Sequence, residues 1–426
     1  MNAKLGEKRA TGELEGEERR RRWPAYALFL GNTISYMGDI MSFLAIPWFV
    51  LQTTGSVEKA GITGFFSALP MVVSAFLGSV LVDRLGYKRT SVIGDVLCGL
   101  TALLIPLLYH TVGLAFWQML ALVFCGGLLR SPADTARDSL VPDLAKLAGM
   151  RLERANAWND GTVRGARFLA APLAGLLITL IGTSNLLWLD AASFAISALL
   201  IGLSVPAHIQ SRAQDEQKES RGGYLAELKE GLRFVRLDVV ISTIVGVVMI
   251  TNMLDAASSA VVMPVYVMQT FHSALFQGIL MSAFGGAAFV GAAIFGTIGH
   301  RLPRRLTFGL CFTIGAALRF WVLLTANFPL ILGWFLLSGL MIGPINSLIA
   351  TALQERTPPA MRSRVFGLVG AGAMAGNPLG TFAAGFVIAW LGLHWTLFAM
   401  GALYLLATLS ILVNPKMKAM NHSQTM

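Results

Sequence analysis

The sequence predicts an all-α membrane protein whose twelve transmembrane helices form two pseudo-symmetric six-helix bundles. Two observations carry this prediction. The chain of 426 residues is 55% hydrophobic and only 13% charged, and its second half repeats a pattern found in its first. Because an ordinary soluble domain carries about 25% charged residues, the composition points to lipid around the helices.

Long apolar runs separated by short loops set the number of helices. A helix that crosses the hydrocarbon core needs about 20 mostly apolar residues, and twelve stretches satisfy this length. They lie near residues 24–52, 57–82, 90–110, 112–133, 157–181, 185–204, 236–270, 274–299, 306–325, 329–351, 365–390 and 394–414.

An internal repeat divides these helices into two sets of six. The stretch PVYVMQTFHSALFQG at 264–278 repeats PWFVLQTTGSVEKAG at 47–61, so that Pro, Val, Gln, Thr, Ser and Gly recur at an offset of 217 residues. Between the halves, residues 208–223 are polar and charged, as in a linker. The domains expected are a tail at 1–23, a first bundle at 24–205, a linker at 206–231, a second bundle at 232–414 and a tail at 415–426.

The basic residues are distributed on one side of the predicted membrane. Among the 33 Lys and Arg, the exceptions are Lys59, Arg164, Arg167 and Arg319. Such a bias marks cytoplasmic loops, so we expect a multi-pass protein of the cytoplasmic membrane with both termini in the cytoplasm. The apolar run after Arg22 is too long for the core of a signal peptide. The net charge of +10 is therefore a topology signal, and no nucleic-acid partner is expected.

Motifs for other chemistry are missing from the sequence. Cys98, Cys125 and Cys311 lie in apolar segments at unrelated spacings, so neither a disulfide nor a metal site is indicated. The chain has no Gly-x-x-x-x-Gly-Lys-Ser/Thr phosphate loop and no His-Glu-x-x-His pair. We therefore expect no cofactor and no enzymatic activity, and an ion gradient remains as the energy source.

The loop GSVLVDRLGYKRT at 78–90 carries the most specific motif. It contains Asp83, Arg84, Gly86, Lys88 and Arg89. In this respect the chain resembles the major facilitator superfamily, whose signature loop between the second and third helices reads Asp-Arg-x-Gly-x-Arg/Lys-Arg/Lys. The resemblance covers essentially the whole chain and implies the major facilitator fold, with the acid acting as a conformational latch between the halves. His300 replaces that acid in the second repeat, so the latch should be one-sided; the alternative is that the charges only anchor the loop.

A finer resemblance is to the subgroup of macrolide-efflux proteins and enterobactin exporters. Gly38-Asp39 in the first helix, AIPWFVLQTTGS at 45–56 and RSPADTARDSLVPD at 130–143 carry it. This resemblance implies efflux of drugs or of a siderophore, and hence a contribution to antibiotic resistance.

Acids inside apolar helices are the candidate proton carriers, because an ionised carboxylate against lipid is costly. Asp39 shares a helix face with Asn32 and Tyr36, and Asp255 in the seventh helix follows Asn252 with similar spacing. Two midplane carboxyls on repeat-related helices can take up a proton on one side and release it on the other. The alternative is that each acid is structural and hydrogen-bonded to neighbouring helices.

Three arginines also fall within predicted helices. Arg164 and Arg167 share a face with Asp160, with which Arg164 can pair one turn away. These two arginines either gate the pathway or only extend to the cytosolic interface. Arg319 lies deeper and needs an acidic partner or a water-filled pocket; the sequence does not identify that partner.

These features together favour a secondary active transporter in which two related halves alternate around one site. We expect proton-coupled efflux of small amphipathic organic compounds, with protons and membrane lipid as further partners and the monomer as the working unit. The alternatives are a lipid or lysolipid flippase of the same fold and a non-transporting membrane sensor or scaffold.

Overall fold

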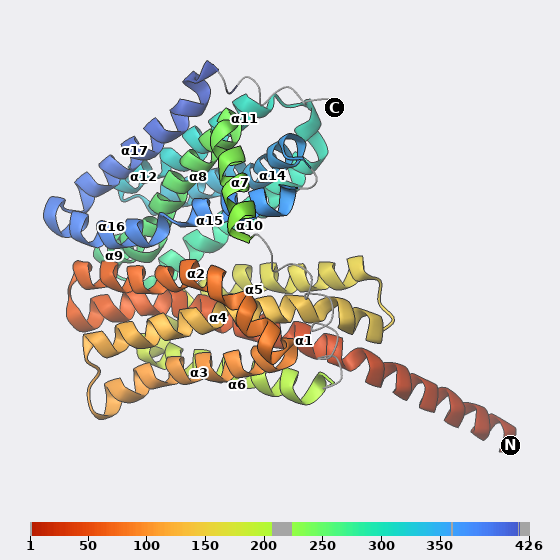
Figure 1. Cartoon of the computed structure of the whole chain (residues 1–426). Coiled ribbons are helices and arrows are strands. Elements are labelled where there is room, and N and C mark those ends of the chain that lie inside the picture. Colours follow the sequence, from red (N-terminus) through yellow and green to blue (C-terminus); the bar gives the residue numbers. More distant parts are fainter. Residues whose placement is uncertain (1, 207–223, 359–360, 416, 418–426) are drawn as a thin grey trace. The chain divides into compact units, whose positions relative to one another are not determined.

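The structure, a computed structural model, describes residues 2–206, 224–358, 361–415 and 417. Within these ranges the side chains are described except at 2–21, 75–84, 224–229, 231, 300 and 363–364. Most of the predicted linker and of the predicted C-terminal tail therefore lies outside the described residues. The described chain consists of helices and short connections (Figure 1).

Six long helices form the first half. They are α1 (Asn2–Thr54), α2 (Val57–Leu85), α3 (Tyr87–Thr111), α4 (Phe116–Leu147), α5 (Leu152–Ile181) and α6 (Thr183–Ser204). Helix α1 begins well before the predicted residue 24, and its apolar part is Arg22–Thr54. Helix α4 extends beyond the predicted residue 133, because its charged second half continues the same helix.

The second half begins with a short helix, α7 (Tyr224–Leu237), and then follows the predicted order with more breaks. The segments are α8 (Val239–Ala257), η2 (Ser258–Val262) and α9 (Met263–Thr270); α10 (Ala274–Ile298); α11 (Arg304–Leu310), η4 (Cys311–Ala317), α12 (Arg319–Val322) and η5 (Leu323–Thr325); α13 (Phe328–Ile342) and α14 (Ile345–Arg356); α15 (Arg362–Met374) and α16 (Asn377–Leu391); and α17 (Leu393–Val413). A 3₁₀ turn, η3 (Gly299–Arg301), follows α10.

The predicted helical membrane fold is confirmed. In the described part of the chain, ten helical segments are long and apolar enough to cross a membrane. Helices α2 and α4, with 29 and 32 residues, are also long enough to span about 30 Å of hydrocarbon at about 1.5 Å per residue.

The sequence repeat has a structural counterpart at two helix junctions. Gly55 and His272, which are 217 residues apart, both adopt the left-handed backbone conformation, with φ of 65° and 57°. A non-glycine residue rarely does so. The serine that follows each of them, Ser56 or Ser273, accepts a backbone N–H from the next helix at 3.1 or 3.4 Å. The repeated sequence therefore forms the same turn and the same serine N-cap in both halves.

The contacts divide the chain into two compact units, each of which is described by itself. Unit 1 comprises Met1–Ser42, Val73–Ala170 and Ser184–Glu219, and unit 2 comprises Phe43–Val72, Ala171–Thr183 and Ser220–Met426. The boundary that the sequence places at 206–231 remains a prediction.

Unit 1 holds an apolar core where α1, α4, α5 and α6 meet. Leu28, Leu140, Leu144 and Ile201 are fully buried there. Close helix packing depends on small residues: a Cβ added at Gly94 of α3 would lie 2.6 Å from the Ala133 Cβ of α4. Small residues at crossings are typical of helix packing in membranes. In unit 2, Val235, Ile241, Leu353, Val365 and Val369 form a buried cluster.

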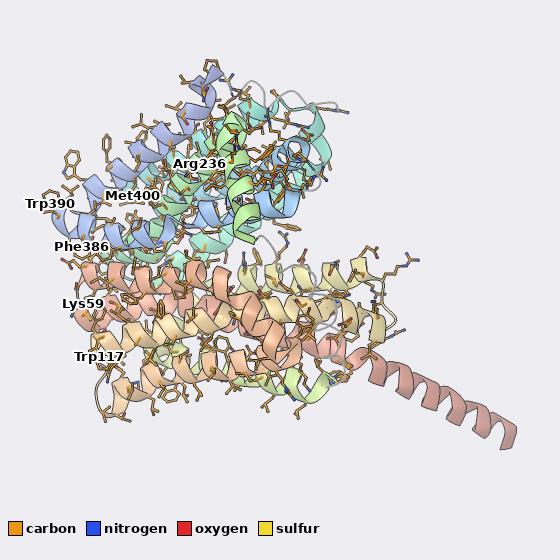
Figure 2. The ribbon with its side chains drawn as sticks, viewed as in Figure 1. Lys59, Trp117, Arg236, Phe386, Trp390 and Met400 are labelled. Atoms are coloured by element: carbon orange, nitrogen blue, oxygen red, sulfur yellow. The ribbon has the colours of Figure 1, made fainter. Side chains whose placement is uncertain are left out.

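Large apolar side chains remain exposed on the outer surface. Trp390 of α16 is 86% exposed and Trp117 of α4 is 69% exposed, and both project away from the ribbon (Figure 2). Exposed apolar surface on this scale is what a lipid environment requires. Both of these tryptophan side chains are therefore placed to contact lipid.

Candidate functional site

Asp39 of α1 forms an ion pair with Arg130 of α4 inside unit 1. The Arg130 Nη2 atom lies 3.5 Å from Asp39 Oδ2; the Asp39 side chain is 42% exposed, and that of Arg130 only 11%. Arg130 is also held by Asp134 Oδ2, 3.0 Å from its Nε, and donates from Nη1 to Ser35 Oγ at 2.9 Å. The arginine is therefore anchored independently of Asp39.

Aromatic rings enclose the Arg130 guanidinium group. Its central carbon lies 5.0 Å from the centre of the Tyr36 ring and 5.3 Å from that of Phe194, within the range of a cation–π interaction. The Nη2 atom that approaches Asp39 is buried and makes no hydrogen bond. The contact between Asp39 and Arg130 is therefore an electrostatic attraction at a distance longer than a hydrogen bond.

Asp255 of α8 supplies the partner that Arg319 lacked in the sequence interpretation. In unit 2, Arg319 Nη2 of α12 pairs with Asp255 Oδ1, and the Tyr404 hydroxyl of α17 donates to Asp255 Oδ2 at 3.4 Å. The Asp255 side chain is 35% exposed and that of Arg319 is 10% exposed. The arrangement therefore repeats that of Asp39: a partly exposed acid is held by a nearly buried arginine.

Two π-helical segments flank the second pair. Segment η2 begins at Ser258, three residues after Asp255, and segment η4 ends at Ala317, two residues before Arg319. Such bulges are rare and are frequent at functional sites. Both helices that carry the pair thus leave regular α geometry next to the charged residue.

The predicted asparagines tie helices together. Asn32, which is 1% exposed, donates from Nδ2 to Asn159 Oδ1 of α5 at 3.1 Å. Asn252 donates from Nδ2 to the backbone carbonyl of Ala373 in α15, also at 3.1 Å. Of the predicted polar stripe on α1, Tyr36 and Asp39 meet at Arg130, whereas Asn32 points to α5.

The remaining predicted residues do not join either ion pair. Arg164 and Arg167 of α5 are exposed, and among the described side chains neither takes part in an ion pair, so the pair of Arg164 with Asp160 is not found. In the signature loop, Gly86 has a φ of 80°, which permits the tight turn between α2 and α3. Lys88 is half-buried and Arg89 exposed at the start of α3. The side chains of Asp83 and Arg84 lie outside the described residues, so the latch remains a prediction.

The sequence interpretation missed a second buried ion pair in unit 1. Asp95 of α3 pairs with Arg137 of α4; their side chains are 0% and 1% exposed. Ser197 of α6 donates to Asp95 Oδ2 at 2.7 Å, and Arg137 also contacts Asp134 at 3.3 Å. It also missed Asp190 of α6, which is 3% exposed. The signal that identified Asp39, a lone acid in an apolar run, applies equally to Asp95 and Asp190.

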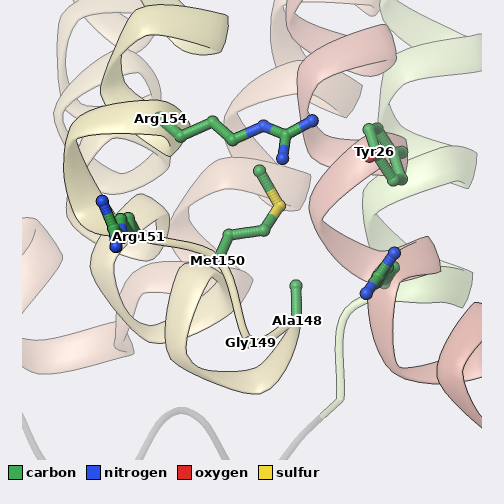
Figure 3. Close-up of a pocket in the computed structure, with 7 residues that line it drawn as sticks. Tyr26, Ala148, Gly149, Met150, Arg151 and Arg154 are labelled. Carbon is green, nitrogen blue, oxygen red and sulfur yellow. The ribbon is translucent and has the colours of Figure 1, made fainter.

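A separate cavity of about 430 Å³ lies at the end of unit 1 where α4 turns into α5. It is lined by Arg22, Tyr26, Ala148, Gly149, Met150, Arg151 and Arg154. Figure 3 shows Arg154 reaching across towards Tyr26 with Met150 beside it. Guanidinium groups so arranged can bind an anionic group. This cavity shares no residue with the acid–arginine pairs.

Comparison with known proteins decides the family. A sequence profile described as the Major Facilitator Superfamily matches residues 28–256 and 245–425. The chain belongs to the Major Facilitator Superfamily. This confirms the resemblance seen in the loop motif, and the chain is accordingly a multi-pass membrane protein of this transporter superfamily.

Two relatives and one solved structure place the chain within the superfamily. It is 29% identical over 384 residues to the multidrug efflux pump Tap of Mycobacterium tuberculosis, covering 89% of this chain and 90% of that protein. It is 28% identical over 375 residues to the enterobactin exporter EntS of Citrobacter koseri, covering 84% and 83%. The fold matches the crystal structure of the nucleoside transporter NupG with a TM-score of 0.74 at 12% identity, covering 91% of this chain and 98% of that one. The efflux subgroup predicted from the sequence is therefore supported by its relatives.

Proposed function

We propose that this superfamily member is a proton-coupled exporter of small amphipathic organic compounds. One observation carries the proposal: Asp39 and Asp255, on repeat-related helices, each combine a partly exposed carboxylate with a nearly buried arginine. Intramembrane acids are costly and usually mark an ion or substrate pathway. The similarity to a multidrug efflux pump and to an enterobactin exporter supports the direction and the class of substrate.

The ion pairs suggest how a proton and a substrate compete. While Asp39 is ionised, it neutralises part of the charge of Arg130 and can also attract a cationic group of a substrate. When Asp39 is protonated, Arg130 keeps its contacts with Asp134 and Ser35, and its positive charge repels such a group. Binding of a proton therefore weakens binding of a cationic substrate, which is the condition for exchange.

The aromatic rings at the two pairs suit amphipathic compounds. Arg130 lies near Tyr36 and Phe194, and Arg319 lies 5.9 Å from the Phe284 ring centre and 4.9 Å from that of Phe320. Apolar rings beside a few charges are typical of small-molecule sites.

The proton gradient supplies the energy for export. A tenfold gradient supplies about 1.4 kcal/mol per proton, enough to move a neutral compound against a tenfold concentration gradient.

The proposal includes the location and topology of the chain. We place it in the cytoplasmic membrane with both termini in the cytoplasm, because the basic loops fall on one side, and we propose the monomer as the working unit. Gly86 and the charged residues Asp83, Arg84, Lys88 and Arg89 are proposed as the latch between halves. Cysteine labelling from either side of the membrane tests this topology.

Reconstituted protein tests the exchange itself. Proteoliposomes with an imposed pH gradient are assayed for movement of ethidium, erythromycin and enterobactin by the wild type, Asp39→Asn, Asp255→Asn and the control Asp143→Asn. We expect movement of at least one compound that depends on the gradient, is lost in Asp39→Asn and persists in Asp143→Asn. Movement of fluorescent phospholipid or lysolipid in place of these compounds would show a flippase, and movement of none of them would favour a sensor or scaffold.

A further inference from the structure

Asp190 of α6 is a buried acid in unit 1 without an arginine partner. It is 3% exposed. In the described part of unit 1, Arg130 pairs with Asp39 and Asp134, and Arg137 pairs with Asp95 and Asp134. These two arginines thus form ion pairs with three carboxylates, which lie on α1, α3 and α4: Asp39, Asp95 and Asp134. No described cation lies within 4.0 Å of the Asp190 carboxyl.

The hydrogen bonds of Asp190 are too few for a carboxylate. An ionised carboxylate offers about four acceptor sites. The Ser42 hydroxyl of α1 donates to Asp190 Oδ2. The Ser193 hydroxyl lies 3.5 Å from Asp190 Oδ1, but its proton is donated to the Asp190 backbone carbonyl at 2.7 Å. Because this hydroxyl has a single proton and the backbone carbonyl is the nearer acceptor, Oδ1 receives at most a weak hydrogen bond from Ser193.

The backbone of α1 completes the enclosure. A Cβ added at Gly38 would lie 2.5 Å from Asp190 Oδ1, and even closer to Ser193 Oγ. The absence of a side chain at Gly38 therefore lets α6 approach α1 and places the Asp190 carboxyl against the helix that carries Asp39. The Gly38-Asp39 dipeptide thus has a physical explanation. Gly38 leaves room for the Asp190 carboxyl, and Asp39 is the second acid beside it.

The charged groups that face Asp190 come from three helices. Asp39 on α1 is a like charge, and Arg130 on α4 reaches the same region through its contact with Phe194, one turn along α6. On α3, Asp95 is already held by Arg137 and by Ser197 of α6. Arg130 makes no ion pair with Asp190, and a buried acid with no ion-pair partner beside a like charge is more stable in its neutral form.

We propose that Asp190 is a proton-binding site of the transporter, whose carboxyl carries a proton at rest and exchanges it during transport. The proposal rests on the proton coupling proposed above and adds a site behind the partly exposed Asp39. In each cycle the O–H bond of Asp190 breaks, the proton leaves for water, and a new proton is bound from the opposite side. Asp39 remains the acid at which the proton and the substrate compete.

Infrared spectroscopy of the full-length protein in lipid nanodiscs tests this assignment without a substrate. A protonated carboxyl has a carbonyl band that a carboxylate lacks, and between about pH 6 and about pH 9 an ordinary aspartate, with a pKa of about 3.9, contributes none. We expect the wild type and Asp143→Asn to show such a band, and Asp190→Asn to lose the part of its intensity that comes from Asp190. Absence of the band from the wild type, or its persistence unchanged in Asp190→Asn, would overturn the proposal.

Transport assays separate this proposal from the proposed function. In Asp190→Asn, we expect counterflow of ethidium to persist, because exchange needs no net proton movement, and accumulation driven by a pH gradient to fall at least tenfold. Asp190→Glu, which keeps the carboxyl, should restore part of that accumulation and shift the frequency of the band; it is the variant of choice if Asp190→Asn does not fold. Gradient-driven accumulation that is unchanged in Asp190→Asn overturns the role of Asp190 alone. If transport by the wild type does not depend on the pH gradient, the proposed proton coupling is overturned, and with it the exchange of the Asp190 proton.

Discussion

The fully buried pair of Asp95 and Arg137 should contribute to stability, in contrast to the partly exposed pairs. Asp95→Asn removes the charge opposite Arg137, whose side chain is 1% exposed. Breaking a buried pair in this way typically costs about 3–5 kcal/mol. We expect about 3 kcal/mol, the lower end, because Asp134 remains 3.3 Å from the Arg137 guanidinium and the new amide can still accept a hydrogen bond.

The chain offers a matched control in the pair of Arg304 and Glu355. Both of those side chains are 31% exposed, so solvent screens the charges and Glu355→Gln should cost at most about 1 kcal/mol. Unfolding by sodium dodecyl sulfate, followed by tryptophan fluorescence, measures both variants. A loss in Asp95→Asn no larger than that in Glu355→Gln would refute the reasoning.

A double variant separates the cost of an unpaired charge from the value of the pair. Asp95→Asn combined with Arg137→Met removes both charges, so no uncompensated guanidinium remains. Because the two residues are in direct contact, their effects should not add, and we expect the double variant to recover at least about 1 kcal/mol relative to the sum of the single variants. Strict additivity would show that the two side chains do not interact.

Three further predictions concern the other contacts. Asp39→Asn should abolish gradient-driven transport. It should change the free energy of unfolding by less than about 1 kcal/mol, because Arg130 keeps its ion pair with Asp134; a loss as large as that expected for Asp95→Asn would contradict this. Trp48, which is 3% exposed, donates from its indole N–H to Gln277 Oε1 at 2.7 Å within unit 2, so Gln277→Leu should cost about 1–3 kcal/mol in the unfolding assay by removing the acceptor of a buried donor, and an unchanged free energy of unfolding would refute this. Gly38→Val should cost about 1–3 kcal/mol by overpacking against Asp190, whereas Gly161→Val, with open space at that position, should cost nothing in the same unfolding assay, because valine has a higher helix propensity than glycine.

Local signals in the sequence were sufficient for the fold and for two of the acids. A run of about 20 apolar residues is a helix signal that does not depend on packing, and a charge within such a run is visible at once. Asp39 and Asp255 could therefore be identified from the sequence. The repeat of residues 47–61 at 264–278 was also visible as spacing, and the structure shows that Gly55 and His272, at equivalent positions within it, form the same turn.

The partners of those acids could not be predicted, because they depend on how helices cross. Arg319 lies 64 residues from Asp255 in the chain, and no periodicity links two helices at that separation. The π segments next to this pair, Ser258–Val262 and Cys311–Ala317, also carry no signal in the spacing of the sequence. Asn32 shows the limit of spacing as evidence: it lies on the predicted face of α1, but its amide turns to Asn159 of α5 rather than to Arg130.

The movement of protons in the opposite direction to the substrate tests the central claim most directly. Proteoliposomes loaded with ethidium and a pH indicator, with no imposed pH gradient, are diluted so that ethidium leaves through the protein. We predict that the lumen becomes acidic as protons enter in exchange, and that Asp39→Asn abolishes this change. Exit of ethidium through the wild-type protein with no change in lumenal pH would contradict the account.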